Sequence, residues 1–173
     1  MKNIILTGLM GAGKSTIGRA LAKRRRMEFF DSDRLIEERT GVDIPTIFEI
    51  EGEEGFRDRE QQVIADLVAE KGVVIAIGGG SLIREANRNL LTESGILIYL
   101  RATPQQLYSR IRYDKSRPLM QTDNPLQTLT RILKNREKYY LDTADLIIRT
   151  GKHRVNVTIK QIENGLNQLG EGH

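Results

Sequence analysis

A glycine-rich phosphate-binding pattern near the start of the chain constrains the fold more than any other feature. An apolar run at residues 3–7 is followed at residues 8–15 by Gly-x-x-x-x-Gly-Lys-Ser. The glycines allow backbone N–H groups to turn inward around a phosphate, Lys14 brings a positive charge, and the Ser15 hydroxyl can ligate Mg²⁺. Because a helical segment follows, the phosphates would lie at a helix N-terminus. The sequence therefore predicts binding of nucleotide phosphates.

Beyond this loop, apolar segments alternate with helical ones. Strands are expected at residues 3–7, 27–30, 73–77, 95–100 and 146–149. Helices are expected at residues 17–24, 34–40, 46–50, 53–70, 85–91, 103–112, 126–140 and 155–169, and the polar stretch at 113–125 is typical of a mobile loop. This alternation predicts an α/β fold with helices on both faces of a parallel sheet. A length of 173 residues without a repeat or linker favours one domain, residues 1–173.

Composition excludes several classes of function. The chain has no cysteine, so disulfides and thiol catalysis are excluded, and only His153 and His173 could supply imidazole to a zinc site. No apolar run approaches a membrane span and no signal-peptide pattern is present, which favours a cytoplasmic protein. The net charge is +4, but aromatic residues are only 5% of the chain. The basic run at residues 23–26 is short and isolated, so it is interpreted as the last turn of a helix rather than as a nucleic-acid site.

Two aspartates follow the second expected strand. If the strand continued through Asp31 and Asp33, both carboxylates would face one crevice, whereas a turn at Ser32 would direct one to the metal and the other to a second substrate. Divided use is the favoured hypothesis. The alternative is a structural one, in which the two aspartates are a pair of capping carboxylates on the next helix, for which Ser32 or Asp33 is also a candidate cap. Ligands of parallel sheets gather where strands end, which is where the phosphate loop, these aspartates and a glycine triplet at residues 78–80 all lie.

Several arginines could bind an anion. Arg57 could grip a planar anion or could form an exposed ion pair with Glu60, three residues along a helix. Arg117, in the irregular stretch, could place a charge over a transferring phosphate, and Arg136 lies on the following helix. The triplet could be a plain loop or could bring backbone N–H groups close to a ligand. Together the residues predict a phosphotransferase that pairs Mg-nucleotide with a small, anionic, hydroxyl-bearing acceptor.

The ordered set of motifs resembles the shikimate kinases, a family of the nucleoside-monophosphate-kinase-like P-loop group. The resemblance covers about residues 1–149. It rests on six groups of residues in chain order: the phosphate loop at residues 8–16; residues 30–33, followed by Ile36 and Glu37; Gly52 and Glu53, followed by Phe56, Arg57 and Glu60; residues 78–80; residues 117–119; and Arg136 near Tyr139. It implies phosphorylation of the shikimate 3-hydroxyl by ATP, on the pathway to chorismate and the aromatic amino acids.

The resemblance also implies roles for individual residues. Asp33 would hydrogen-bond the hydroxyls of shikimate, Arg57 and Arg136 would grip its carboxylate, and Gly79 and Gly80 would add backbone contacts. One Mg²⁺ would be bound directly by Ser15 and, through a water molecule, by Asp31. The catalytic residues that the resemblance implies are Lys14, Asp33 and Arg117. The residues that would contact ATP are Gly11, Ala12, Gly13, Lys14, Ser15, Thr16, Arg110, Arg117 and Arg154.

Arg110 resembles an arginine that stacks on adenine. The loop at residues 150–155 lacks a proline typical of the family, so Lys152, His153 or Arg154 could cover the other face of adenine.

The fold implied by the resemblance is a three-layer P-loop NTPase fold. Its parallel five-stranded sheet would have the strand order 2-3-1-4-5, with a shikimate-binding helical region at about residues 32–61 and a lid at about 113–124. The expected partners are ATP and shikimate, with no nucleic acid or membrane, and the enzyme is expected to be a monomer. The alternatives are a gluconate kinase of the same group and a weakly active nucleotide-binding regulatory module. A GTPase is disfavoured because no Asn-Lys-x-Asp motif is present.

Overall fold

The chain folds around a five-stranded parallel sheet. The structure, a computed structural model, describes residues 1–113 and 122–170. The strands are β1 (Asn3–Thr7), β2 (Glu28–Asp31), β3 (Val73–Ala76), β4 (Gly95–Arg101) and β5 (Leu146–Arg149). The helices are α1 (Lys14–Arg25), α2 (Ser32–Thr40), α3 (Ile44–Ala69), α4 (Glu85–Ser94), α5 (Pro104–Ile111), α6 (Pro125–Thr143) and α7 (Val155–Gln168). The sheet order β2-β3-β1-β4-β5 confirms the predicted topology.

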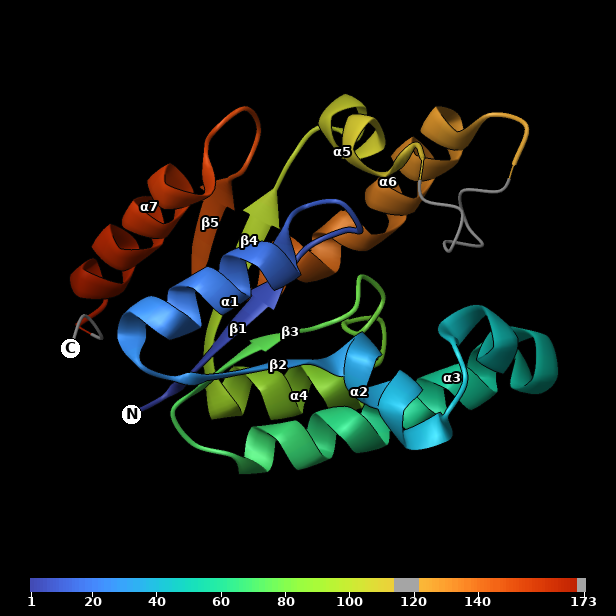
Figure 1. Ribbon diagram of the computed structural model, residues 1–173, viewed down its shortest axis with the longest axis horizontal. Helices are drawn as coiled ribbons and strands as arrows, with labels where there is room; N and C mark the ends of the chain where they lie inside the picture. Colours follow the sequence, from blue (N-terminus) through green and yellow to red (C-terminus); the bar gives the residue numbers. More distant parts are fainter. Residues whose placement is uncertain (114–121, 171–173) are drawn as a thin grey trace.

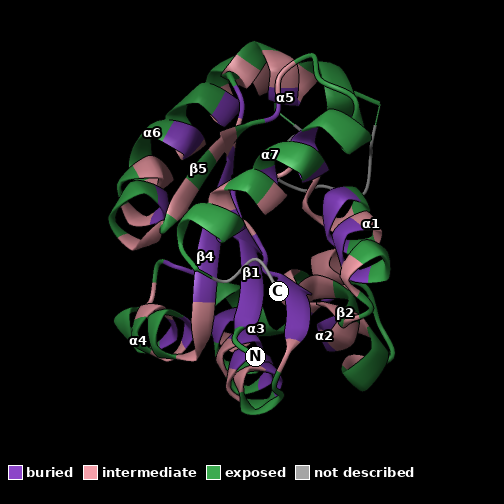
Figure 2. Ribbon diagram, turned by 90° about the vertical axis from the view of Figure 1, so that its left-hand side faces the viewer, coloured by how far each residue is buried: buried purple, intermediate pink, exposed green. Residues whose placement is uncertain are grey.

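Helices cover both faces of the sheet. Figures 1 and 2 show α1 and α7 on one face and α3, α4 and α6 on the other. All residues of β1 and β3 are buried, as is the middle of β4, because these strands are covered on both faces. Since β1 pairs in parallel with both β3 and β4, the segments that follow these strands all emerge at one edge of the sheet. This edge is where ligands of such sheets bind.

Helix α1 begins inside the phosphate loop, at Lys14 rather than at the expected residue 17. Its N-cap is Gly13, whose φ of 93° lies in the left-handed region that favours glycine. Lys23, Arg24 and Arg25 form its last turn, as predicted, where cations complement the helix dipole, whereas Arg26 is the C-cap with a left-handed φ of 56°. Arg24 also pairs with Glu163 of α7 at 3.0 Å, so part of the basic run ties two helices together.

Helix α2 is capped by Asp31, one of the two carboxylates considered as caps from the sequence. Neither Ser32 nor Asp33 is the cap; β2 ends at Asp31, and its carboxylate accepts hydrogen bonds from the N–H groups of Asp33 (3.0 Å) and Arg34 (3.3 Å). A turn directly after the strand leaves these N–H groups without helical partners, and the nearest upstream carboxylate satisfies them.

The two helices expected at residues 46–50 and 53–70 form one element, α3, with a kink at Gly52. Gly52 has a φ of 72° and non-helical backbone angles, which explains why the sequence indicates a break there. Asp43 caps α3 by accepting from the Thr46 N–H at 2.9 Å. The kink separates a short first part, which belongs to the predicted helical region at 32–61, from a longer part that packs on α4.

Most of the predicted lid lies outside the described residues, and so does Arg117. The flanking elements agree with the sequence: α5 starts with a capping box at Thr103, and α6 starts at Pro125 after the Asn124 cap. No helix in the part of the chain that the structure describes is long and apolar enough to cross a membrane.

Candidate active site

A cleft of about 930 Å³ lies where the phosphate loop, the end of β2 and the loop after β3 converge. Of the residues predicted to form a site, it brings together Gly11, Gly13, Lys14, Ser15, Thr16, Asp31, Asp33, Arg57, Gly79, Gly80, Arg110 and Arg136. These residues come from six segments of the chain. The predicted convergence at one edge of the sheet is therefore confirmed for the described residues.

The phosphate loop forms one end of this cleft. Gly11 and Gly13 have φ angles of 82° and 93°, and Ala12 between them is buried. Lys14 Nζ donates to the carbonyl oxygens of Gly8 at 2.6 Å and Leu9 at 3.1 Å, so its ammonium group lies over the loop. Nucleotide phosphates entering this end would meet the start of α1 and this charge.

Ser15 and Asp31 offer a site suited to Mg²⁺. The Ser15 hydroxyl donates to Asp31 Oδ2, while Asp31 Oδ1 caps α2, so the two carboxylate oxygens have separate tasks. Hydroxyl and carboxylate oxygens are the ligands that Mg²⁺ prefers. Among residues 1–113 and 122–170 no group of three or more acidic, histidine or cysteine side chains could enclose a metal. This fits Mg²⁺, which usually keeps several waters and binds substrate phosphates with one or two protein ligands.

Asp33 lies in the first turn of α2 and faces the loop after β3. A Cβ atom added to Gly78 would lie 2.7 Å from Asp33 Oδ1 and 3.1 Å from Glu60 Oε2. The Gly78 N–H donates to the Ser32 hydroxyl at 3.1 Å, which fixes the start of this loop against α2. The first glycine of the triplet therefore makes room for two carboxylates as well as connecting two elements.

Arg57 forms a buried ion pair, which corrects the exposed pair considered from the sequence. Arg57 Nη1 lies 2.9 Å from Glu60 Oε1, and Glu60 is 0% exposed. Ser81 Oγ donates to the other oxygen of Glu60 at 2.8 Å. The pair is buried because α3 packs against the glycine-rich loop, and a Cβ at Gly80 would lie 2.8 Å from Arg57 Cζ. Within the described chain, the buried Arg57 Nε has no hydrogen-bond acceptor.

Arg136 brings a second guanidinium group to the same end of the cleft. A Cβ at Gly79 would lie 3.5 Å from Arg136 Nη1, so the guanidinium lies against this glycine. Burial lowers the pKa of Arg136 from its usual value, and the charge of Arg57 lowers it further. Two guanidinium groups that repel each other in a half-buried place are suited to bind an anion such as a carboxylate.

Arg110 connects the phosphate loop to the loop after β5. Its guanidinium donates to the carbonyl oxygens of Gly11 (2.8 Å) and Gly151 (2.6 Å), and also to Thr150. Arg154 is exposed at the start of α7 and is not among the residues that line the cleft. The structure thus places Arg110 at the nucleotide end and keeps Arg154 outside the cleft.

Some residues of the site were missed when the sequence was considered alone. Phe48 and Phe56, whose rings lie 4.8 Å apart, line the cleft on the two sides of the Gly52 kink. Phe56 belongs to the set of residues that carries the family resemblance, but it received no role there, because aromatic residues at helical spacing usually indicate core. Tyr140 was also missed, although it lies one helical turn after Arg136.

The fold and the cleft define a P-loop phosphotransferase with two guanidinium groups in its cleft. The family model for shikimate kinase matches residues 10–167. The shikimate kinase of Burkholderia thailandensis is 49% identical over 168 residues, which cover 97% of this chain and 91% of that protein. The chain therefore belongs to the shikimate kinase family, whose enzymes transfer phosphate from ATP to shikimate.

Solved structures agree with this assignment. The shikimate kinase of Acinetobacter baumannii, solved in complex with shikimate, has a TM-score of 0.93 at 42% identity and covers 98% of this chain and 94% of its own. A gluconokinase from Sinorhizobium meliloti reaches a TM-score of 0.62 at 17% identity over 98% and 94% of the two chains, which shows a shared fold only.

Proposed function

We propose that this chain phosphorylates the 3-hydroxyl of shikimate with Mg-ATP, giving shikimate 3-phosphate and ADP for chorismate and aromatic amino acid synthesis. One observation carries the proposal. Arg57 lies against Gly80 and Arg136 lies against Gly79, and both arginines line the same cleft as the phosphate loop. A single cleft can therefore hold a carboxylate beside the two arginines and the terminal phosphate of ATP at the phosphate loop.

The acceptor end would orient shikimate through its carboxylate. Arg57, held by Glu60, has a buried Nε–H that finds no acceptor among the described residues, and a carboxylate oxygen could accept from it. Asp33 would then hydrogen-bond the ring hydroxyls and accept the proton of the attacking one, as an aspartate does in other kinases. Gly79 and Gly80 have no side chains, so their backbone would allow the hydroxyl-bearing ring of shikimate to approach closely.

The nucleotide end would act by positioning and charge. Lys14 would stabilise the negative charge that develops on the transferring phosphoryl group. Ser15 and Asp31 would hold Mg²⁺, which would neutralise charge on the phosphate oxygens. Arg110 would support the adenine side by fixing the loop at residues 150–151 against the phosphate loop. We also propose that the enzyme is cytoplasmic and acts as a monomer. Gel filtration at micromolar concentration can test the monomeric state.

An ADP-release assay tests the proposed function. Purified protein with Mg-ATP should release ADP when shikimate is added, and not with gluconate or nucleoside monophosphates, which lack the ring carboxylate that the two arginines would bind. Chelation of the metal with EDTA should stop the reaction, and added Mg²⁺ should restore it. ADP release that depended strictly on gluconate would refute the proposal.

Arg117 provides a separate prediction, since it lies outside the described residues and its role rests on the sequence. Arg117→Ala should lower kcat by about 10²–10³ because a charge that stabilises the transferring phosphoryl group is lost. The KM for shikimate should change much less. Steady-state kinetics against Arg112→Ala, a neighbouring arginine with no assigned role, provides the control, and wild-type turnover in Arg117→Ala would contradict the role.

A further inference from the structure

A buried tyrosine connects two groups of the acceptor end without lining the cleft itself. Tyr140 lies on α6 and is 1% exposed. Its hydroxyl donates a hydrogen bond to the carbonyl oxygen of Gly79, in the loop after β3. Its ring packs on that of Tyr99 in β4, with centroids 5.0 Å apart. Tyr140 therefore ties α6, the sheet and the glycine loop to one another.

The same residue also interacts with Arg136. Arg136 and Tyr140 are four residues apart on α6, so they project from the same face of the helix. The Arg136 guanidinium lies against Gly79, whose carbonyl is the acceptor of the Tyr140 hydroxyl. Burial raises the pKa of Tyr140 above its ordinary value, whereas the charge of Arg136 and its hydrogen bond to Tyr140 lower it. The phenol consequently stays protonated and can donate to Gly79 at any physiological pH.

We propose that Tyr140 is a positioning residue that sets the place of the Arg136 guanidinium relative to the Gly79 backbone, and thereby the affinity for the acceptor carboxylate. The inference rests on the proposed function, in which both groups contact shikimate. Without this hydroxyl, its hydrogen bond to the Gly79 carbonyl and its hydrogen bond with Arg136 would both be lost, and α6 would no longer be tied to the glycine loop through Tyr140.

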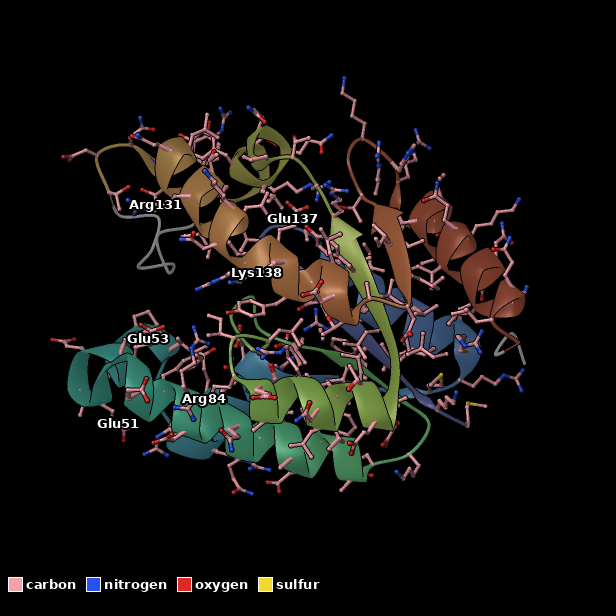
Figure 3. The ribbon with its side chains drawn as sticks, turned by 180° about the vertical axis from the view of Figure 1, so that it is seen from behind. Glu51, Glu53, Arg84, Arg131, Glu137 and Lys138 are labelled. Atoms are coloured by element: carbon pink, nitrogen blue, oxygen red, sulfur yellow. The ribbon has the colours of Figure 1, made fainter. Side chains whose placement is uncertain are left out.

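A neighbouring tyrosine offers a matched control. Tyr99 is equally buried at 1% exposure, and its ring forms the other half of the aromatic pair. Its hydroxyl donates to Glu137 Oε1 at 3.2 Å instead of to the glycine loop, and the same oxygen pairs with Arg101 at 2.9 Å. Figure 3 shows Glu137 on α6 beside β4. Removing this hydroxyl therefore disturbs the contact between α6 and β4 and leaves the bond to Gly79 in place.

The test compares Tyr140→Phe with Tyr99→Phe. Both variants keep the ring and lose one buried hydroxyl. Tyr140→Phe should raise the KM and the Kd for shikimate roughly tenfold, which is the size expected when a hydrogen bond to a charged group, here Arg136, is lost. The kcat and the KM for ATP should stay within about twofold of wild type. Tyr99→Phe should lower the melting temperature about as much as Tyr140→Phe does, because each variant loses one buried hydroxyl. It should leave the KM for shikimate within about twofold of wild type.

A double-mutant cycle shows whether Tyr140 acts through Arg136. In an Arg136→Ala background, Tyr140→Phe should weaken shikimate binding by less than about threefold, because the group that it positions is absent. Equal KM values for shikimate in wild type and Tyr140→Phe, or a full tenfold effect in the Arg136→Ala background, would overturn the inference. Wild-type protein that releases no ADP with shikimate would instead refute the proposed function on which the inference rests.

Discussion

Arg57→Ala should damage both shikimate use and folding, whereas Arg136→Ala should damage mainly shikimate use. Arg57 is 7% exposed and pairs with a fully buried carboxylate, so its removal leaves the Glu60 charge without its partner. Breaking such a pair costs about 3–5 kcal/mol of stability. Each substitution also removes a contact that we propose to the acceptor carboxylate, which should lower kcat/KM for shikimate by about 10²–10³.

Kinetics and denaturant unfolding on the same preparations separate the two effects. Arg57→Ala combined with Glu60→Gln should recover part of the lost stability, because the buried charge is gone while Ser81 keeps its acceptor, but it should not recover shikimate use. Arg84→Ala is the control. Arg84 pairs with Glu54 and Asp58 on the outer side of α3, outside the residues that line the cleft, and Figure 3 shows it there. Unchanged shikimate kinetics in both Arg57→Ala and Arg136→Ala would remove them from the site.

Asp33→Asn should lower kcat by about 10²–10⁴, the range for loss of a group that accepts a proton in the transition state. The amide has nearly the same shape, so binding of ATP should be unaffected and the KM for shikimate should change little. The cost to stability should stay below about 1 kcal/mol, since Asp33 contributes to α2 as an acidic residue in its first turn, while the cap is Asp31.

The measurement is steady-state ADP release at saturating shikimate, with melting temperatures to confirm folding. Asp66→Asn is a suitable control, because Asp66 is an exposed carboxylate of α3 that pairs with Arg39 away from the cleft. A kcat within about twofold of wild type in Asp33→Asn would mean that another group receives the proton.

Much of the fold could be predicted because its signals are local. Strand β5 has the expected bounds at Leu146–Arg149, and Asp43 with Pro45 marks the start of α3 as expected. Apolar runs of strand length, capping side chains and glycines in turns act within a few residues of each other, so they can be read from the chain alone. The strand order came from the family resemblance, since no local signal specifies which strands are neighbours.

For the candidate site, the sequence predicted the phosphate loop well but not the burial of its charged residues or the cap of α2. The residue types at the phosphate loop are so constrained by phosphate chemistry that they were identified directly. The i,i+3 spacing of Arg57 and Glu60 predicted their contact but not its burial. The cap of α2 could not be chosen from the sequence because Asp31, Ser32 and Asp33 can all cap a helix, and the choice depends on the residue at which β2 ends.

The sequence by itself determined the element types, the phosphate loop and the set of charged residues available for phosphoryl transfer. Only the tertiary structure decided which of those charges are buried and what each one meets. Glu60 and Ser81, or Tyr140 and Gly79, are far apart along the chain and come into contact through packing around the sheet. The physical reason is that desolvation and pairing of a charge depend on every segment packed around it, whereas a sequence pattern records only its neighbours along the chain.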